Sequence, residues 1–417
     1  FGGGCSRKVL NYQVAECIGT LNQYENNEPV ETPKMKAERE QKESESECES
    51  QKQKVLEEAA VLAKEYRYDE AISCLQSADV LAEDERMNEA VAQYEAAKAD
   101  LYEYEGDIPN FCFTNLVVDP SRAFDGDDYD STYRNNMITL TEFQNILQAL
   151  YDSNYILGDL HSLATETENG KNVTMSQQNP VIPKGKKPMV LSIDNLSYGS
   201  VRNGDGVATA LVVDENGKAA AKYTDEGGHD LIGAYDVVPV LEAFLEEHPD
   251  FSYQGARGVI SVAGVGGIFG YEVDETADDY ETNRKTVQEI ADALKEEGWT
   301  FASNGYNYQY LGTLSYDQLT SELTAWEEVS GALLGECDTL LYPYGSEIDY
   351  TSEKATLLAT MNMRYLIGLW ADGDHLEVTD EYLRQTRRNI TGMLLTTAPD
   401  SLSSYINVSE ILDPERN

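Results

Sequence analysis

Several polar and aromatic side chains follow short apolar runs of the sequence, where the loops of a folded domain are expected. Asp194 and Asn195 come directly after the run Met189–Ile193, and Asn304 and Tyr308 stand four residues apart in a later segment. Further aromatic residues occur in the same segments, namely Tyr198, Trp299, Tyr306, Tyr310, Tyr342, Tyr344 and Trp370. Aromatic faces beside Asn and Asp side chains are typical of a sugar-binding cleft, where rings stack and amides orient the ligand. Loop aromatics also serve as plain packing, and sugar binding is only slightly favoured over that interpretation.

Histidine and cysteine, the common ligands of transition metals, give little support for a metal site. The histidines are His161, His229, His248 and His375. His248 precedes a proline at the expected end of a helix, where an imidazole interacts well with the helix dipole. His229 lies in a polar insertion, where a solvated side chain is favoured over one that folds across the cleft. The six cysteines show no CxxC spacing, which argues against a zinc knuckle and against a disulfide scaffold.

From about residue 108 onward, short apolar runs alternate with amphipathic segments. The runs predict strands at Phe111–Val118, Met189–Ile193, Val259–Val265, Thr339–Leu341, Tyr365–Leu369 and Met393–Leu395. The amphipathic segments predict helices at Leu140–Asp152, Val237–Glu247, Glu281–Glu297, Tyr316–Leu334 and Ser352–Met361. This alternation predicts an α/β fold with a parallel sheet, either open or closed into a barrel. Residues 198–235 interrupt it as a Gly- and Asp-rich insertion, in which Asn216-Gly217 predicts a hairpin turn.

The first hundred residues have a different character from the rest. Residues 1–54 are predicted as an acidic tether or frayed helix, because their polar part buries too little apolar surface to fold. Residues 55–106 predict a helical hairpin module that resembles one tetratricopeptide-type helix pair. Only one and a half repeats are visible, so a spacer or stalk is favoured over a peptide-binding array. Residues 107–417 then form the α/β domain.

The charge of the chain excludes some partners. With 31 Lys+Arg against 75 Asp+Glu, the formal net charge is −44, which repels nucleic-acid phosphates and anionic lipids. No run of 18 or more apolar residues predicts a membrane span. The segment Phe1-Gly-Gly-Gly-Cys5 loosely matches a lipoprotein cleavage site, with a cloning scar or the foot of a removed membrane anchor as alternatives. We expect an exported, extracellular protein that is anchored at the cell surface.

The α/β half carries a set of landmarks in a familiar order. They are Ile108-Pro-Asn-Phe111, Thr141–Tyr155, Pro188–Asn195, Leu294–Asn304 and Leu341-Tyr-Pro-Tyr-Gly345. In this order they resemble the polysaccharide deacetylase (NodB-homology, carbohydrate esterase) superfamily over residues 108–412. The resemblance implies a distorted (β/α) barrel with its site at the carboxyl ends of the strands. It also implies hydrolysis of an N-acetyl amide by a metal-bound water, with one Asp and two His as ligands and a second Asp as base.

The sequence departs from that pattern at most of its chemical positions. Asp194 keeps the base position, but Asn195 stands where the resemblance implies the metal carboxylate. Asn304 and Tyr308 stand at the two imidazole positions, and Leu341 replaces an arginine. An amide oxygen and a neutral phenol are weak zinc ligands, so the loss of all three strong ligands, at positions 195, 304 and 308, is expected to abolish the metal site.

The last landmarks are kept in part. Pro343, Tyr344 and Gly345 remain, whereas the expected closing strand Leu394-Leu395-Thr396-Thr397 has threonine where the resemblance implies a general-acid histidine. We therefore expect a pseudoenzyme without a cofactor that binds a polysaccharide of the cell envelope or environment, with Asp194 as catalytic base only if activity remains. The expected ligand contacts are Asn195, Asn304, Tyr308, Tyr342, Pro343 and Tyr344. Two alternatives stay open: an active N-acetyl hydrolase with Zn²⁺ or another divalent metal at a rearranged site, and an interaction scaffold that binds a protein through residues 55–105.

Overall fold

The computed structural model describes residues 32–77, 84–169, 172–199 and 201–416. These residues form two compact units, one from the chain up to Ala60 together with Glu70–Ala92, and one from Val61–Asp69 together with the chain from Gln93 onward. The first 31 residues of the expected tether, including the Phe1–Cys5 segment, lie outside the described residues. Among the described helices, none is both long enough and apolar enough to cross a lipid bilayer.

The N-terminal part of the chain is helical. Its helices are α2 Pro33–Lys64, α3 Tyr68–Ser77 and α4 Glu85–Ala99. Helix α2 runs without a break across the boundary expected at residues 54 and 55, because its Glu, Lys and Gln residues favour helix and form i,i+4 ion pairs such as Arg39–Glu43. Within the smaller unit, Arg86 at the start of α4 binds Glu49 of α2 at 2.7 Å.

Seven parallel strands of the larger unit close into a barrel, the fold that the family resemblance implied. Around the ring they are β7 Lys187–Ile193, β11 Val259–Val262, β12 Thr300–Ser303, β13 Thr339–Leu341, β14 Tyr365–Gly368, β16 Leu383–Asn389 and β2 Asn110–Phe113. Strand β2 pairs in turn with β7, so the ring has no free edge. Strand β3 (Tyr155–Leu157) adds to β7 in parallel, and β15 (Leu376–Val378) adds to β16 in antiparallel orientation.

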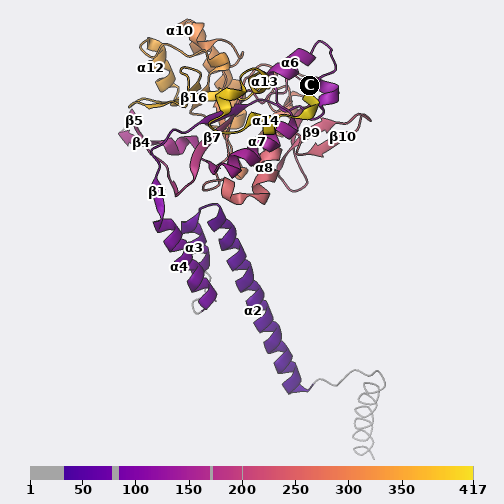
Figure 1. Cartoon of the computed structure of the whole chain (residues 1–417), viewed down its shortest axis with the longest axis vertical. Helices are drawn as coiled ribbons and strands as arrows, with labels where there is room; N and C mark the ends of the chain where they lie inside the picture. Colours follow the sequence, from indigo (N-terminus) through magenta and orange to yellow (C-terminus); the bar gives the residue numbers. More distant parts are fainter. Residues whose placement is uncertain (1–31, 78–83, 170–171, 200, 417) are drawn as a thin grey trace, which may run out of the picture. The chain divides into compact units, whose positions relative to one another are not determined.

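Amphipathic helices surround this barrel. The larger ones are α7 Leu140–Asp152, α8 Val237–Glu247, α9 Tyr280–Glu297, α10 Tyr316–Trp326 and α12 Glu353–Thr360. Helix α7 packs against α8, and α10 packs against α12 (Figure 1). The predicted α7 has the observed bounds because its start is marked by a capping box, in which Thr139 and Glu142 exchange hydrogen bonds with the backbone. Shorter helices are α5 Pro120–Ala123, α6 Asp130–Asn136, α11 Ala332–Leu334, α13 Gly392–Thr397 and α14 Val408–Ile411.

Three small antiparallel sheets lie outside the barrel. The insertion 198–235 folds as β8 Ala208–Val213, β9 Ala219–Thr224 and β10 Asp230–Gly233, in the order β10-β9-β8. The predicted hairpin is confirmed, because Val213 pairs with Ala219 across the Asn216-Gly217 turn and Gly217 has the positive φ of 81° that such a turn uses. The other pairs are β1 Leu101–Glu103 with β6 Val181–Pro183, and β4 Ala164–Asn169 with β5 Asn172–Gln177.

The closing strand was predicted in the wrong place. The expected strand Met393–Leu395 lies within helix α13, whose start is capped by the Thr391 side chain accepting from the Leu394 N–H at 3.1 Å. The strand that closes the barrel is β16, which has three arginines and a single apolar residue, Leu383. A three-residue apolar run fits a helix as well as a strand, so the pattern alone could not separate the two.

Candidate functional site

A cleft opens at the carboxyl ends of the barrel strands. Its volume is about 470 Å³, and its walls come from the end of β2, from α6, from the loops after β7, β12 and β13, and from the end of β16. The side chains that face it include Asn115, Asp194, Asn195, Tyr308, Tyr344, Arg387, Asn389 and Thr391. Because parallel barrels carry their sites at this end, the cleft is the candidate functional site.

Asp194 lines this cleft and is held by three donors, one from β16 and two from the segment after β12. The Arg387 guanidinium forms an ion pair with Asp194 Oδ2 at 3.0 Å. The Tyr308 hydroxyl donates to Asp194 Oδ1 at 3.1 Å, and the Asn304 amide donates to the same oxygen at 3.3 Å. The Asp194 side chain is only 9% exposed. Both carboxylate oxygens are therefore engaged inside the protein.

Arg387 is the partner that the sequence analysis missed. Its side chain is 1% exposed, and besides Asp194 it donates to the Tyr342 carbonyl at 3.1 Å. Burial disfavours its charge, but the adjacent Asp194 carboxylate outweighs this and raises the pKa of Arg387 above its ordinary value. Its position in β16 offers a signal in retrospect, because Gln385, Arg387 and Asn389 share one face of a strand.

The residues at the three expected metal-ligand positions do not fit a metal ion. The Asn304 and Tyr308 side chains point donors, not lone pairs, at Asp194. The Asn195 side-chain oxygen accepts from the Ala263 N–H at 3.1 Å, so it serves the backbone of the next strand end. Burial and the Asp194 charge raise the pKa of the Tyr308 phenol well above 10, which keeps it a neutral, weak ligand. Asn304 and Tyr308 are thus tied to Asp194, while the buried side-chain oxygen of Asn304 has no hydrogen-bond partner among the described residues.

The remaining positions expected to contact ligand separate into two groups. Tyr344 lines the cleft and is 53% exposed. Tyr342 is fully buried, with its hydroxyl 3.1 Å from that of Tyr350, and Pro343 is buried beside it. Asn304 is also fully buried and reaches the cleft only through its bond to Asp194. Tyr342 and Pro343 thus support the wall rather than face a ligand, because the chain turns outward only at Tyr344.

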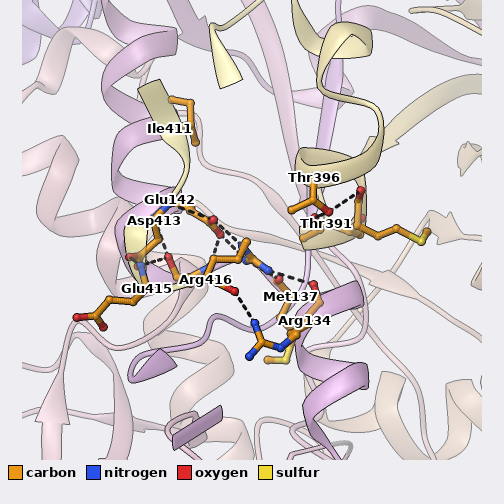
Figure 2. A network of polar contacts seen from close by, with 12 residues as sticks. Arg134, Met137, Glu142, Thr391, Thr396, Ile411, Asp413, Glu415 and Arg416 are labelled. Atoms are coloured by element: carbon orange, nitrogen blue, oxygen red, sulfur yellow. Dashed lines mark hydrogen bonds and ion pairs between the residues drawn. The ribbon is translucent and has the colours of Figure 1, made fainter. Parts of the chain in front are cut away.

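One wall of the cleft is tied to the C-terminal end of the described chain. Met137 lines the cleft just after α6, and its carbonyl accepts from Arg416 Nη2 at 3.0 Å. Arg416 also donates from Nε to the fully buried Glu142 of α7 at 2.6 Å, while Asp413 accepts from the capping residue Thr139 at 2.8 Å. Figure 2 shows Arg416 lying between Glu142 and the end of α6. This network fixes α6 and α7 relative to the end of β2.

The four histidines all lie in the described part of the chain, and none lines the cleft. His161 lies at the amino ends of the strands, between Asp159 and Asp338 at 3.2 and 2.9 Å. His229 is exposed in the insertion, and His248 ends α8 as expected. Within the described residues, no three His, Cys, Asp or Glu side chains come together as a potential metal site.

A second cavity, of about 310 Å³, lies at the amino ends of the strands. Four of its fourteen lining residues are glycines, and the polar ones include Asp159, Ser162 and Tyr253. Its one arginine, Arg257, is bound to Glu242 at 2.8 Å. This cavity presents little chemistry, and the carboxyl-end cleft remains the better candidate.

Solved structures that align with this chain are described as deacetylases. No protein-family model matches the sequence, and no curated protein matches it. The deacetylase PplD of Streptococcus pyogenes, solved in complex with acetate, aligns at 15% identity with a TM-score of 0.41, over 72% of this chain and 98% of that one. BA0330 of Bacillus anthracis, named as a polysaccharide deacetylase, aligns at 12% identity with a TM-score of 0.40, over 72% and 69% of the two chains.

A third solved structure aligns over a smaller part of this chain. It is a protein of Mycobacterium smegmatis named as a polysaccharide deacetylase, with 18% identity and a TM-score of 0.21 over 35% of this chain and 51% of that one. The closed ring of seven parallel strands, read directly from the strand pairing, is what carries the assignment of the barrel.

Proposed function

We propose that the protein binds a glycan in the carboxyl-end cleft and does not hydrolyse it. The observation that carries this proposal is the state of Asp194, whose two oxygens are occupied by Arg387, Tyr308 and Asn304. A general base must accept a proton from an attacking water, and the three donors take up lone pairs of Asp194 that such a water would use. Asp194 in this setting organises the floor of a binding site.

Deacetylation also needs an electrophilic group, and the residues at the implied ligand positions do not supply one. Amide hydrolysis needs a group that polarises the carbonyl and lowers the pKa of the water. The side chains at the implied ligand positions, Asn195, Asn304 and Tyr308, are engaged with the backbone or with Asp194. The Cys112 thiol in the cleft is no substitute, because burial raises its pKa to about 11 and keeps it neutral.

The polar atoms left over in the cleft suit a glycan. Nε and Nη1 of Arg387 and the side-chain oxygen of Asn389 are buried and have no hydrogen-bond partner among the described residues. Both residues line the cleft. Unpaired buried donors and acceptors carry a free-energy cost, which a ligand bearing hydroxyl or amide groups removes. Since Arg387 and Asp194 neutralise each other, the ligand we propose is uncharged, such as a neutral polysaccharide of the cell envelope, and the proposed location is extracellular.

A glycan array tests this proposal. We expect the purified chain to bind neutral oligosaccharides, and the variant Tyr308→Ala to lose most of that binding, because it removes a cleft wall and a donor to Asp194. The matched control Tyr316→Ala removes an exposed tyrosine of α10 that does not line the cleft. Loss of binding in both variants, or in neither, would count against the cleft. Acetate release from N-acetylated chitotetraose with stoichiometric bound Zn²⁺ would favour the hydrolase instead.

A further inference from the structure

Two tyrosines form a stacked, solvent-exposed pair at the mouth of the cleft. The rings of Tyr310 and Tyr344 are 4.5 Å apart and inclined by only 19°. Tyr310 is 54% exposed and Tyr344 is 53% exposed. Tyr344 also contacts Tyr308 edge to face at 5.1 Å, and Tyr308 donates to Asp194 on the cleft floor. A continuous aromatic surface therefore leads from the cleft to its outside edge.

The loops that carry the pair are tied to each other. The Gly312 N–H donates to the Ser346 carbonyl at 2.9 Å, which joins the loop after β12 to the loop after β13. A side chain at Gly312 would meet the Glu347 carbonyl at 2.1 Å, so the approach of the two loops requires glycine. The Lys354 ammonium binds the Gly312 carbonyl at 3.1 Å. The relative position of the two rings is thus fixed by backbone contacts and does not depend on a ligand.

Tyr344 adopts a backbone conformation that a bulky residue rarely uses. Its φ and ψ are 56° and 13°, in the left-handed region, which is strained for a residue with a bulky side chain. That strain turns the ring outward, where half of its surface is in water and contributes little to the core. A strained backbone that exposes an aromatic ring is expected where the ring serves binding rather than packing.

We propose that Tyr310 and Tyr344 form an outer subsite that stacks on the ring of a second sugar, so that the ligand is an oligosaccharide. This inference rests on the proposed glycan binding and adds the length of the ligand to it. Tyr344 both lines the cleft and forms half of the stacked pair. A glycan that fills the cleft would therefore reach the pair with its next sugar. Phenol faces match the apolar face of a pyranose, and their hydroxyls match its hydroxyl groups.

A length series of N-acetylglucosamine, chitobiose, chitotriose and chitotetraose tests the outer subsite by isothermal titration calorimetry. For the unaltered chain we expect affinity to rise by about tenfold once a second or third sugar reaches the pair, which corresponds to one added stacking contact. Tyr310→Ala should reduce that rise to less than about threefold, with the single sugar as the reference within each variant. Tyr310→Phe, which keeps the ring, should retain the rise, and Tyr316→Ala is the matched surface control.

The outcomes separate the two proposals. If the chain binds no member of the series, the proposed glycan binding fails for this ligand class, and the outer subsite fails with it. If it binds the single sugar and the tetrasaccharide equally well, or if Tyr310→Ala keeps the full rise with length, the cleft stands and the outer subsite is overturned. A rise lost in Tyr310→Ala and kept in Tyr310→Phe supports the subsite.

Discussion

The pairing of Arg387 with Asp194 is tested by removing the cation and leaving the carboxylate in place. The variant Arg387→Met puts a flexible apolar side chain in the buried position of the guanidinium, so the main change is in charge and hydrogen bonding. Asp194 then remains a carboxylate that is 9% exposed and has lost its cation. The Tyr342 carbonyl also loses the hydrogen bond that Arg387 donates to it.

The size of the effect follows from distance and burial. Two unit charges 3.0 Å apart attract by about 5 kcal/mol at an effective dielectric constant of about 20. Desolvation of both ions offsets much of this gain in the folded protein. When one partner is removed, however, the desolvation of the other is no longer compensated, and such losses amount to about 3–5 kcal/mol. We expect the free energy of unfolding of Arg387→Met to fall by about that amount.

A double variant separates the charge from the packing. In Arg387→Met combined with Asp194→Asn, the amide at position 194 still accepts hydrogen bonds but carries no charge. We expect it to be within about 1–2 kcal/mol of the unaltered chain, because replacing a whole buried ion pair is often nearly neutral. Urea unfolding followed by tryptophan fluorescence is a suitable assay, since Trp299, Trp326 and Trp370 all belong to the barrel unit.

The double-mutant cycle also defines the result that would refute this reasoning. A coupling energy near zero, with the double variant as unstable as the sum of the two single variants, would mean that Arg387 and Asp194 do not stabilise each other. A loss below about 1 kcal/mol for Arg387→Met alone would contradict the burial of the pair. Either result would remove the basis for regarding Asp194 as occupied.

Three further predictions concern other parts of the barrel. Tyr308→Phe should lower the free energy of unfolding by about 1 kcal/mol, the worth of one hydrogen bond to Asp194, in the same urea assay; no change would contradict the network. Arg416→Met should lower it by about 3–5 kcal/mol, because Glu142 is fully buried and loses its cation; a loss below about 1 kcal/mol would mean the C-terminal network adds little. Burial opposes the charge of His161, but two carboxylates outweigh it and raise its pKa to about 10 from 6.5. The stabilisation that charged His161 gains from these carboxylates is therefore complete below about pH 6.5 and is lost as the pH rises toward 10. Over that range the melting temperature of the unaltered chain should fall more than that of His161→Gln. Equal slopes of melting temperature against pH would contradict this prediction.

The sequence predicted most of the helices because their signals are local. Helix α7 was predicted with its observed bounds, since its capping box and its apolar stripe occur within a few residues of each other. Helix α8 was predicted equally well from a dense apolar face. The alternation of strands and helices predicted a parallel sheet, open or closed, because short buried strands make that pattern visible, and the closed barrel was implied by the family resemblance.

The floor of the cleft could be predicted only in part. Asp194 was found because it follows an apolar strand, whereas Arg387 was missed because the Arg-rich β16 does not look like a buried strand. A buried arginine is stable only beside its carboxylate, and that partner is almost two hundred residues away in the chain, so no local pattern records it. The burial of Tyr342 likewise depends on its contact with Tyr350, which a motif cannot show.

Saturation-transfer NMR of N-acetylated chitotetraose mixed with the chain, in the presence of Zn²⁺, distinguishes glycan binding without hydrolysis from deacetylation. One spectrum reports both events, because bound sugar protons receive saturation and free acetate gives its own methyl signal. The account predicts saturation of the ring and acetyl protons, no acetate signal over many hours, and a strong loss of saturation in Tyr308→Ala. An accumulating acetate signal, or the absence of saturation transfer from the unaltered chain, would contradict it.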